Sequence, residues 1–205
     1  MNPVLFILEK PMLRKVYRAF ASVARVIPYY LMKEYLLDED ELDIQPRLGP
    51  LDVELLGVSD IETLMDDPEI LEEKEELLQR FQDGCLCLGL KHEGKVAAFC
   101  WCDPECFQFK KIKYKLKENE AYLFDIRTFQ AYRGKNLAPF LRYQLYKHLT
   151  QKGLTDFYSL TMMLNTSSGR FKRKLGAKTY KLCVYVCFFN KFYMNIPIKT
   201  YFKDK

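Results

Sequence analysis

The sequence contains few residues of the types that most often act as catalytic bases, with only two histidines in 205 residues. His92 falls in a predicted turn and His148 in a predicted helix, so no Ser-His or Cys-His arrangement for nucleophilic catalysis is recognisable. Internal repeats and low-complexity segments are also absent, which excludes repeat architectures. Hydrophobic residues make up 49% of the chain, enough for a sizeable core.

We expect no signal for secretion. Its apolar start is too short and wrongly flanked for a signal peptide or a membrane span. The seven cysteines are an odd number, as expected in a reducing, intracellular compartment, so we expect a cytoplasmic protein. Each of the pairs Cys85/Cys87 and Cys100/Cys102 lies on one face of a predicted strand. Four such thiols could bind zinc, but we favour buried free cysteines and predict no metal.

The charge of the chain is mildly positive, at +5, and unevenly distributed. Acidic residues crowd residues 34–83, whereas basic residues dominate from Lys110 onward. This balance favours polyanionic ligands only weakly, because strong nucleic-acid binders are usually more basic, and we expect no nucleic-acid partner. The lysine-rich, aromatic stretch 107–119 is interpreted as an irregular loop or an exposed strand, with single-stranded nucleic-acid binding as the alternative.

The N-terminal part, residues 1–48, is predicted to be a helical extension followed by an acidic connector. Apolar residues at helical spacing predict a basic amphipathic helix over Met12–Ile27, ended by Pro28. We favour docking of this helix on the chain's own domain or on a twin subunit in a homodimer, with an anionic membrane surface as the alternative. Residues 191–205 are predicted to be a basic-aromatic tail.

The remaining chain alternates strand and helix signals, which predicts an α/β or α+β domain with a mixed sheet. A capping box at Ser59 predicts the start of a helix, and His92-Glu-Gly94 predicts a hairpin turn. The expected strands are 51–58, 85–90, 95–102, 122–128, 156–163 and 178–189. Helices are expected after Ser59 and over 68–81, 139–152 and 165–175.

The most informative stretch is the strand from Tyr122 to Thr128 and the turn that follows it. Arg133-Gly134-Lys135 leads directly into a helix N-terminus, where unpaired amides and the helix dipole favour anions. Asn136 tolerates a positive φ better than most residues other than glycine, and Pro139 suits a first helical turn. We therefore predict a phosphate-binding turn.

This stretch resembles the coenzyme A-binding motif of the GNAT superfamily of N-acetyltransferases. The run Arg133-Gly134-Lys135-Asn136-Leu137-Ala138 follows the family pattern, with Asn136 in place of a glycine and Pro139 as a second departure. Thr128 to Gly134 and the later Asn165 with Lys174-Leu175-Gly176-Ala177 also match in order. The resemblance covers about residues 51–189 and implies a domain at 49–190 whose mostly antiparallel sheet, flanked by helices, splays open at the CoA-binding strand.

The resemblance also implies a function. The expected activity is direct transfer of an acetyl group from acetyl-CoA to an amine of a small molecule or peptide. The alternatives are a long-chain donor carried by CoA or an acyl carrier protein, and a non-catalytic acyl-CoA-binding module. Ile126 and Thr128 would pair with the pantetheine arm, and Asn165 would lie near it. The pyrophosphate would rest on Arg133, Gly134, Lys135, Asn136, Leu137 and Ala138.

Catalytic groups are less clearly indicated. Asp125 and Tyr122 are candidate bases, although residues three apart on a strand share a pocket only if a bulge intervenes. The position at which many family members carry a tyrosine acid is Lys172, which could protonate a thiolate but is more often a surface residue.

Overall fold

The computed structural model describes residues 24–65, 67–70 and 72–202. Eight strands form one sheet in the order β10-β9-β1-β8-β7-β4-β3-β2, and β5 and β6 form a separate hairpin. The strands are β1 (Ala24–Glu34), β2 (Asp52–Leu55), β3 (Leu86–His92), β4 (Lys95–Asp103), β5 (Cys106–Phe109), β6 (Ile112–Lys115), β7 (Glu120–Thr128), β8 (Asp156–Met162), β9 (Lys178–Phe188) and β10 (Phe192–Thr200).

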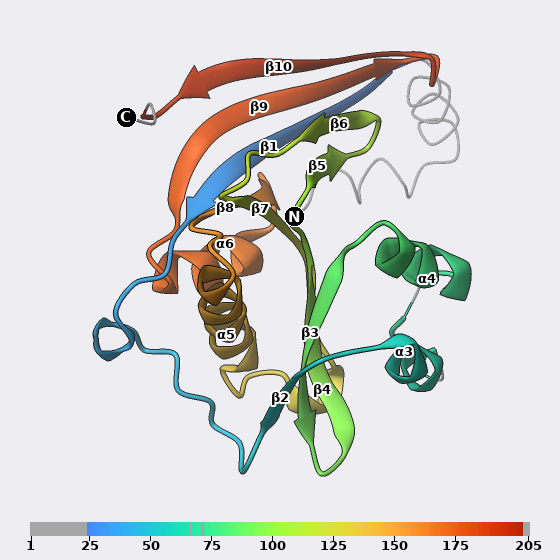
Figure 1. Cartoon of the computed structure of the whole chain (residues 1–205). Helices are drawn as coiled ribbons and strands as arrows, with labels where there is room; N and C mark the ends of the chain where they lie inside the picture. Colours follow the sequence, from blue (N-terminus) through green and yellow to red (C-terminus); the bar gives the residue numbers. More distant parts are fainter. Residues whose placement is uncertain (1–23, 66, 71, 203–205) are drawn as a thin grey trace, which may run out of the picture.

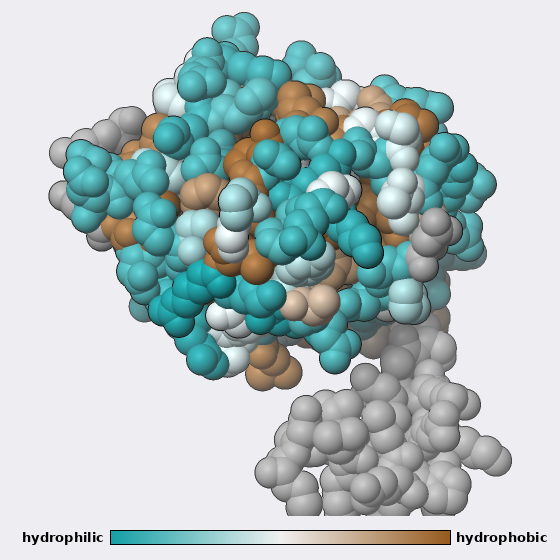
Figure 2. Space-filling view, turned by 90° about the horizontal axis from the view of Figure 1, so that it is seen from below, coloured by the Kyte–Doolittle hydropathy of each residue, from teal (hydrophilic) through white to brown (hydrophobic). Residues whose placement is uncertain are grey.

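Helices cover both faces of the sheet. The pair α5 and α6 lies on one face, and the pair α3 and α4 lies on the other (Figure 1). The helices are α3 (Val58–Leu64), α4 (Lys74–Gln82), α5 (Leu137–Gln151) and α6 (Thr166–Lys174), and the short 3-10 turns are η1 (Glu39–Glu41) and η2 (Gln130–Tyr132). The surface seen from below is mostly hydrophilic, with small, separate hydrophobic groups (Figure 2).

Of the pairings within the eight-stranded sheet, only that of β7 with β8 is parallel. The predicted fold class, a mixed and mostly antiparallel sheet flanked by helices, is therefore confirmed. The predicted hairpin turn is also present between β3 and β4, where Glu93 and Gly94 have φ values of 51° and 76°. Two consecutive residues with positive φ are the signature of a tight turn that matches strand twist.

The parallel pair opens part way along its length. β7 pairs with β8 from Glu120 to Leu123, and no pairing continues beyond Leu123 among the described residues. Instead, β8 continues alongside β1, where Tyr29 pairs with Met162. The edge of β7 that faces β8 is therefore left without a strand partner from Phe124 to Thr128.

The N-terminal helix prediction is wrong where it can be compared with the structure. Residues 24–27 begin strand β1, and residues 12–23 lie outside the described residues. β1 is inserted between β8 and β9 and pairs with both, so tertiary pairing prevails over the helical spacing of its apolar residues. The predicted docking of residues 12–23 remains a prediction.

The C-terminal tail prediction also needs correction. Residues 192–200 form β10, which pairs with β9 from Phe192 to Thr200, so most of the expected tail is an edge strand. The sheet thus extends on both sides of the range 49–190, through β1 and β10. Pro197 and Lys199, two residues that discourage further strand pairing, lie in this edge strand.

Several local predictions shift by a few residues. The helix α3 is capped by Gly57, whose amide donates to the Asp60 carboxylate at 2.8 Å, so Ser59 lies inside the helix. The second acidic helix begins at Lys74 rather than at Pro68. The stretch 107–119 contains the β5–β6 hairpin, in which Phe107 is buried.

The two Cys-x-Cys pairs lie on opposite faces of the sheet. Cys87 is paired with Trp101, and the next residue, Leu88, is paired with Cys100. Directly paired residues share a face of the sheet, and neighbouring residues of one strand point to opposite faces, so Cys87 and Cys100 lie on opposite faces. Cys85 and Cys87 accordingly pack on the α3/α4 side, and Cys100 and Cys102 pack under α5. The four thiols therefore cannot converge on one zinc ion, and all are buried and free.

Candidate active site

The predicted phosphate turn is present and leads into α5. Gly134 and Asn136 have φ values of 78° and 61°, so Asn136 adopts the left-handed conformation that asparagine tolerates better than most residues. Pro139 occupies the third helical position, where its missing amide costs no helical hydrogen bond. The turn and the first residues of α5 therefore line one cleft, despite the two departures from the family pattern.

The acidic connector holds this turn in place. The Asn136 amide group donates to the backbone oxygens of Asp43 and Gln45, at 3.3 and 3.0 Å. The Arg47 amide donates to the Lys135 oxygen at 2.8 Å, and Ile44 is fully buried. The acidic connector predicted from the sequence is therefore a structural part of the site.

A cleft of about 880 Å³ lies between the diverging strands and extends to the turn. Of the residues predicted to bind CoA, all except Lys135 line it, namely Ile126, Thr128, Arg133, Gly134, Asn136, Leu137, Ala138 and Asn165. Lys135 instead lies over the Tyr132 ring, 5.4 Å from its centre. Sequence analysis missed Arg47 and Arg142, and both line the cleft.

The cleft contains a buried polar atom without a partner. Thr128 Oγ1 is buried and has no hydrogen-bond partner among the described residues. Asn165 caps α6, because its side-chain oxygen accepts from the Ser168 amide at 3.0 Å. A ligand that offers amide groups along β7, as a pantetheine arm does, would meet hydrogen-bonding groups at both places.

Lys172 is buried, contrary to the prediction that it lies on the surface. It lines the cleft with 2% of its surface exposed. Its amino group donates to the Leu160 oxygen at 2.6 Å and to Thr161 Oγ1 at 3.0 Å. Burial lowers the pKa of Lys172 to about 8, an effect that Glu34 opposes and Arg142 reinforces.

A buried charge cluster surrounds Lys172. Glu34, from β1, accepts hydrogen bonds from Tyr146 and Ser159. Burial alone would raise the pKa of Glu34, but Arg142, Lys172 and these hydrogen bonds outweigh it and lower the pKa from its ordinary value. Glu34 is therefore a buried carboxylate that counterbalances two buried cations.

The two predicted catalytic residues both line the cleft. A bulge in β7, where Asp125 and Ile126 lie opposite the single residue Cys100 of β4, gives Asp125 a φ of 41° and meets the condition under which Tyr122 and Asp125 can share a pocket. The Asp125 carboxylate is engaged by Arg80 at 2.6 Å and by Arg127 at 3.6 Å. Burial raises the pKa of Tyr122. Tyr122 is thus suited to donate a hydrogen bond, and neither residue is shown to be a base.

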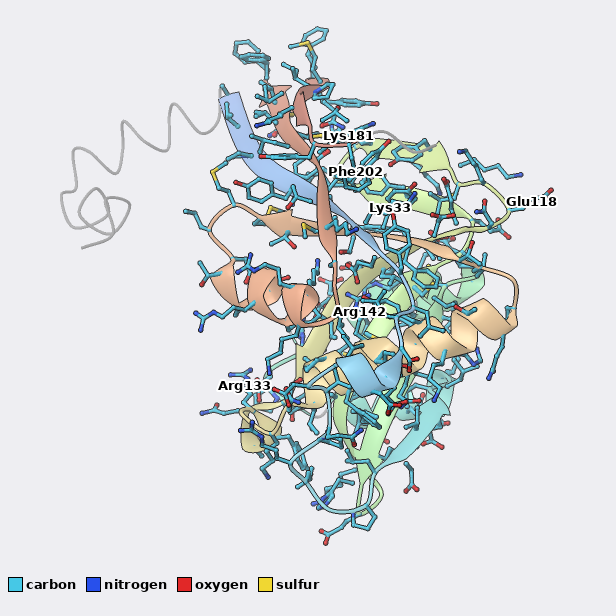
Figure 3. The ribbon with its side chains drawn as sticks, turned by 90° about the vertical axis from the view of Figure 1, so that its left-hand side faces the viewer. Lys33, Glu118, Arg133, Arg142, Lys181 and Phe202 are labelled. Atoms are coloured by element: carbon cyan, nitrogen blue, oxygen red, sulfur yellow. The ribbon has the colours of Figure 1, made fainter. Side chains whose placement is uncertain are left out.

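Arg133 lies at the surface beside the turn, whereas Arg142 lies in the interior between α5 and α6 (Figure 3). Arg133 forms an ion pair with Glu69 and donates to the Thr128 oxygen at 3.0 Å. Its side chain is 57% exposed, so the ion pair is weakened by solvent and can exchange for a phosphate.

A sheet that opens between two parallel strands, with a cationic turn and a helix N-terminus at its mouth, defines a GNAT-type fold. The sequence model of the Acetyltransferase (GNAT) family matches residues 55–177, more than half of the chain. The chain therefore belongs to the GNAT family of acetyltransferases. A search of the curated proteins found no match.

Solved structures support the same fold. A GNAT-family protein from Novosphingobium aromaticivorans is 18% identical over 79% of this chain and 63% of its own, with a TM-score of 0.53. A GNAT-family acetyltransferase from Colwellia psychrerythraea is 18% identical over 90% of this chain and 62% of its own, with a TM-score of 0.55. The chain thus spans less than two thirds of either protein, and at these identities the likeness shows the fold alone.

An N-acetyltransferase from Staphylococcus aureus is 14% identical over 69% of this chain and 99% of its own, with a TM-score of 0.51.

Within the described residues, no helix has the length and apolar character needed to cross a membrane.

Proposed function

We propose that the protein is an acyl-CoA-dependent N-acyltransferase that transfers an acetyl group directly to an amine of a small molecule or peptide. The observation that carries this proposal is the free edge of β7 opposite β8, which continues into the turn at the N-terminus of α5. An extended ligand that carries amide groups and ends in phosphates matches this cleft, because its amides can pair with the free edge of β7 and its phosphates can bind at the turn.

The residues of the cleft fit coenzyme A. Arg47, Arg133 and Lys174 place positive charge beside the turn, where the pyrophosphate would rest on the first amides of α5. Ile126 and Thr128 would offer their main-chain groups to the pantetheine arm, and the unpartnered Thr128 hydroxyl would gain a hydrogen bond. Acetyl-CoA would supply the activated acyl group.

Lys172 is the proposed general acid. In direct transfer the amine nitrogen forms a bond to the acyl carbon and loses a proton, the carbon–sulfur bond breaks, and the departing thiolate takes a proton from Lys172, so the proton lost by the amine balances the one that the lysine gives. Two of the three Lys172 protons are held by Leu160 and Thr161, which leaves one for the cleft. With a pKa of about 8, Lys172 is charged at neutral pH, and its pKa is close to the ordinary pKa of a thiol.

The non-catalytic alternative rested on the altered glycine and the missing tyrosine. The left-handed conformation of Asn136 and the burial of Lys172 in the cleft accommodate both departures, which favours the enzyme. The length of the acyl chain is a matter for measurement. Three aromatic side chains that line the cleft, Phe109, Tyr122 and Phe124, would contact a long acyl chain.

Calorimetry with CoA, acetyl-CoA and palmitoyl-CoA tests this proposal, followed by an amine screen that measures released thiol. We expect acetyl-CoA to bind and Arg133→Glu to weaken that binding by about 1.5–3 kcal/mol, the value of one charge-assisted hydrogen bond. Lys152→Glu makes the same charge change at the exposed far end of α5 and serves as the control. Equal affinity of wild type and Arg133→Glu would contradict the assignment of the turn.

A further inference from the structure

Three charged side chains meet in the interior beside the cleft, and their charges do not balance. Glu34, Arg142 and Lys172 are 0%, 1% and 2% exposed. Buried charges are normally paired, because an unpaired ion loses its hydration without compensation. Two cations here share one carboxylate, so one positive charge has no described counterion within this cluster.

Hydrogen bonding distinguishes the two cations, because one of them lacks acceptors. Lys172 already donates to Leu160 and Thr161, and the two Glu34 oxygens accept from Ser159 and Tyr146. Arg142 forms an ion pair with Glu34, but its Nε lies 3.8 Å from Glu34 Oε2, beyond hydrogen-bond distance. Arg142 Nε and Nη1 are buried and have no acceptor among the described residues.

The position of Arg142 points to a ligand. Arg142 lines the cleft, and its guanidinium lies 6.0 Å from the centre of the Phe171 ring, which also lines the cleft. It stands four residues after Ala138 in α5, about 6 Å deeper than the phosphate turn. Because Arg142 is buried whereas Arg133 at the turn is exposed, an anion bound by Arg142 would be a different group from the phosphates expected at the turn.

We propose that Arg142 binds a carboxylate group carried by one of the two reacting ligands. A guanidinium matches the planar shape of a carboxylate and is the side chain that proteins most often use for it. The carboxylate would come either from a dicarboxylic acyl group on the donor or from an amino-acid acceptor. This inference rests on the proposed function and specifies its substrate class.

The experiment has two arms. In the donor arm, calorimetry compares succinyl-CoA with butyryl-CoA, which has the same number of acyl carbons and no carboxylate. In the acceptor arm, thiol release from acetyl-CoA is measured with a pool of amino acids and with a pool of their amides. In one arm we expect the wild type to favour the carboxylate by about 10- to 100-fold, the value of a charged hydrogen bond. Arg142→Met should abolish this preference.

Three controls make the result decisive. Arg170→Met, an exposed change on α6, should keep the preference. If Arg142→Met does not fold, the double variant with Glu34→Gln removes the Arg142–Glu34 ion pair as a unit and leaves Lys172 as the remaining charge, a change that proteins tolerate better than the loss of one partner. Unacylated CoA provides a separate readout, because failure of the wild type to bind it would overturn the proposed function. Binding of CoA without a carboxylate preference in either arm, or a preference that survives Arg142→Met, would overturn this inference alone.

Discussion

The buried Lys172 makes a prediction about stability as a function of pH. Its pKa is about 8 in the folded protein, compared with an ordinary value of 10.5. Between these values the unfolded chain binds the proton more tightly, so the free energy of unfolding should rise with pH. The difference corresponds to about 3 kcal/mol, gained progressively from about pH 8 to pH 10.5.

Buried thiols and phenols oppose this trend. Burial raises the pKa of Cys85 and of Cys100 to about 12, and it also raises the pKa of Tyr146. These groups contribute stability below their unfolded pKa that is lost as pH rises, because the unfolded chain deprotonates first. The wild-type curve alone is therefore not diagnostic, and the contribution of Lys172 must be obtained by difference.

The measurement is urea unfolding of the wild type and of Lys172→Met at several pH values from 7 to 10.5 under reducing conditions. Methionine keeps an unbranched side chain of similar length and removes the charge. The stability of the wild type relative to the variant should rise by about 3 kcal/mol across this range. Arg173→Met, the exposed neighbour on α6, should run parallel to the wild type. Parallel curves for the wild type and Lys172→Met would refute the argument that Lys172 is a buried cation.

Three further predictions concern stability and metal content. Glu34→Gln leaves two buried cations without their carboxylate and should lower the free energy of unfolding by about 3–5 kcal/mol. Urea unfolding at pH 7 measures this, and an unchanged value would mean that Glu34 is not their counterion. In Gly89→Ala, the new Cβ would lie 2.5 Å from Leu56 Cδ2, so we expect a loss of about 1–3 kcal/mol, compared with little change for Gly49→Ala, where the nearest atom is 3.7 Å away. Elemental analysis should find no stoichiometric zinc, because the two cysteine pairs lie on opposite faces of the sheet, and stoichiometric zinc lost on substituting Cys87 and Cys100 would contradict this.

Local signals predicted the part of the site that is built from one continuous stretch. The strand β7, the turn and α5 follow one another directly, so their residues determine their own geometry. Asn136 illustrates this, because its tolerance of positive φ is a property of the residue, and its φ of 61° follows. The hairpin at Glu93-Gly94 was predictable for the same reason.

The features that sequence analysis missed depend on contacts between distant segments. The helix predicted over Met12–Ile27 runs into the first residues of β1, because no local pattern shows that β8 and β9 leave room for a strand between them. The burial of Lys172 likewise depends on β8, whose Leu160 and Thr161 accept its hydrogen bonds. Lysine is rarely buried without such partners, so the sequence alone favours a surface position for Lys172.

The insertion of β1 also links the N-terminal region to the chemistry of the cleft. Glu34, at the end of β1, is the carboxylate that faces both Arg142 and Lys172, and it reaches them because β1 pairs with β8. The match to the family begins only at residue 55, so this carboxylate lies outside the matched segment. If Lys172 protonates the leaving thiolate, Glu34 sets how readily it does so, because Glu34 raises the lysine pKa against the effect of burial. The strand that the family pattern did not predict therefore acts as a positioning and charge-setting element of the proposed active site.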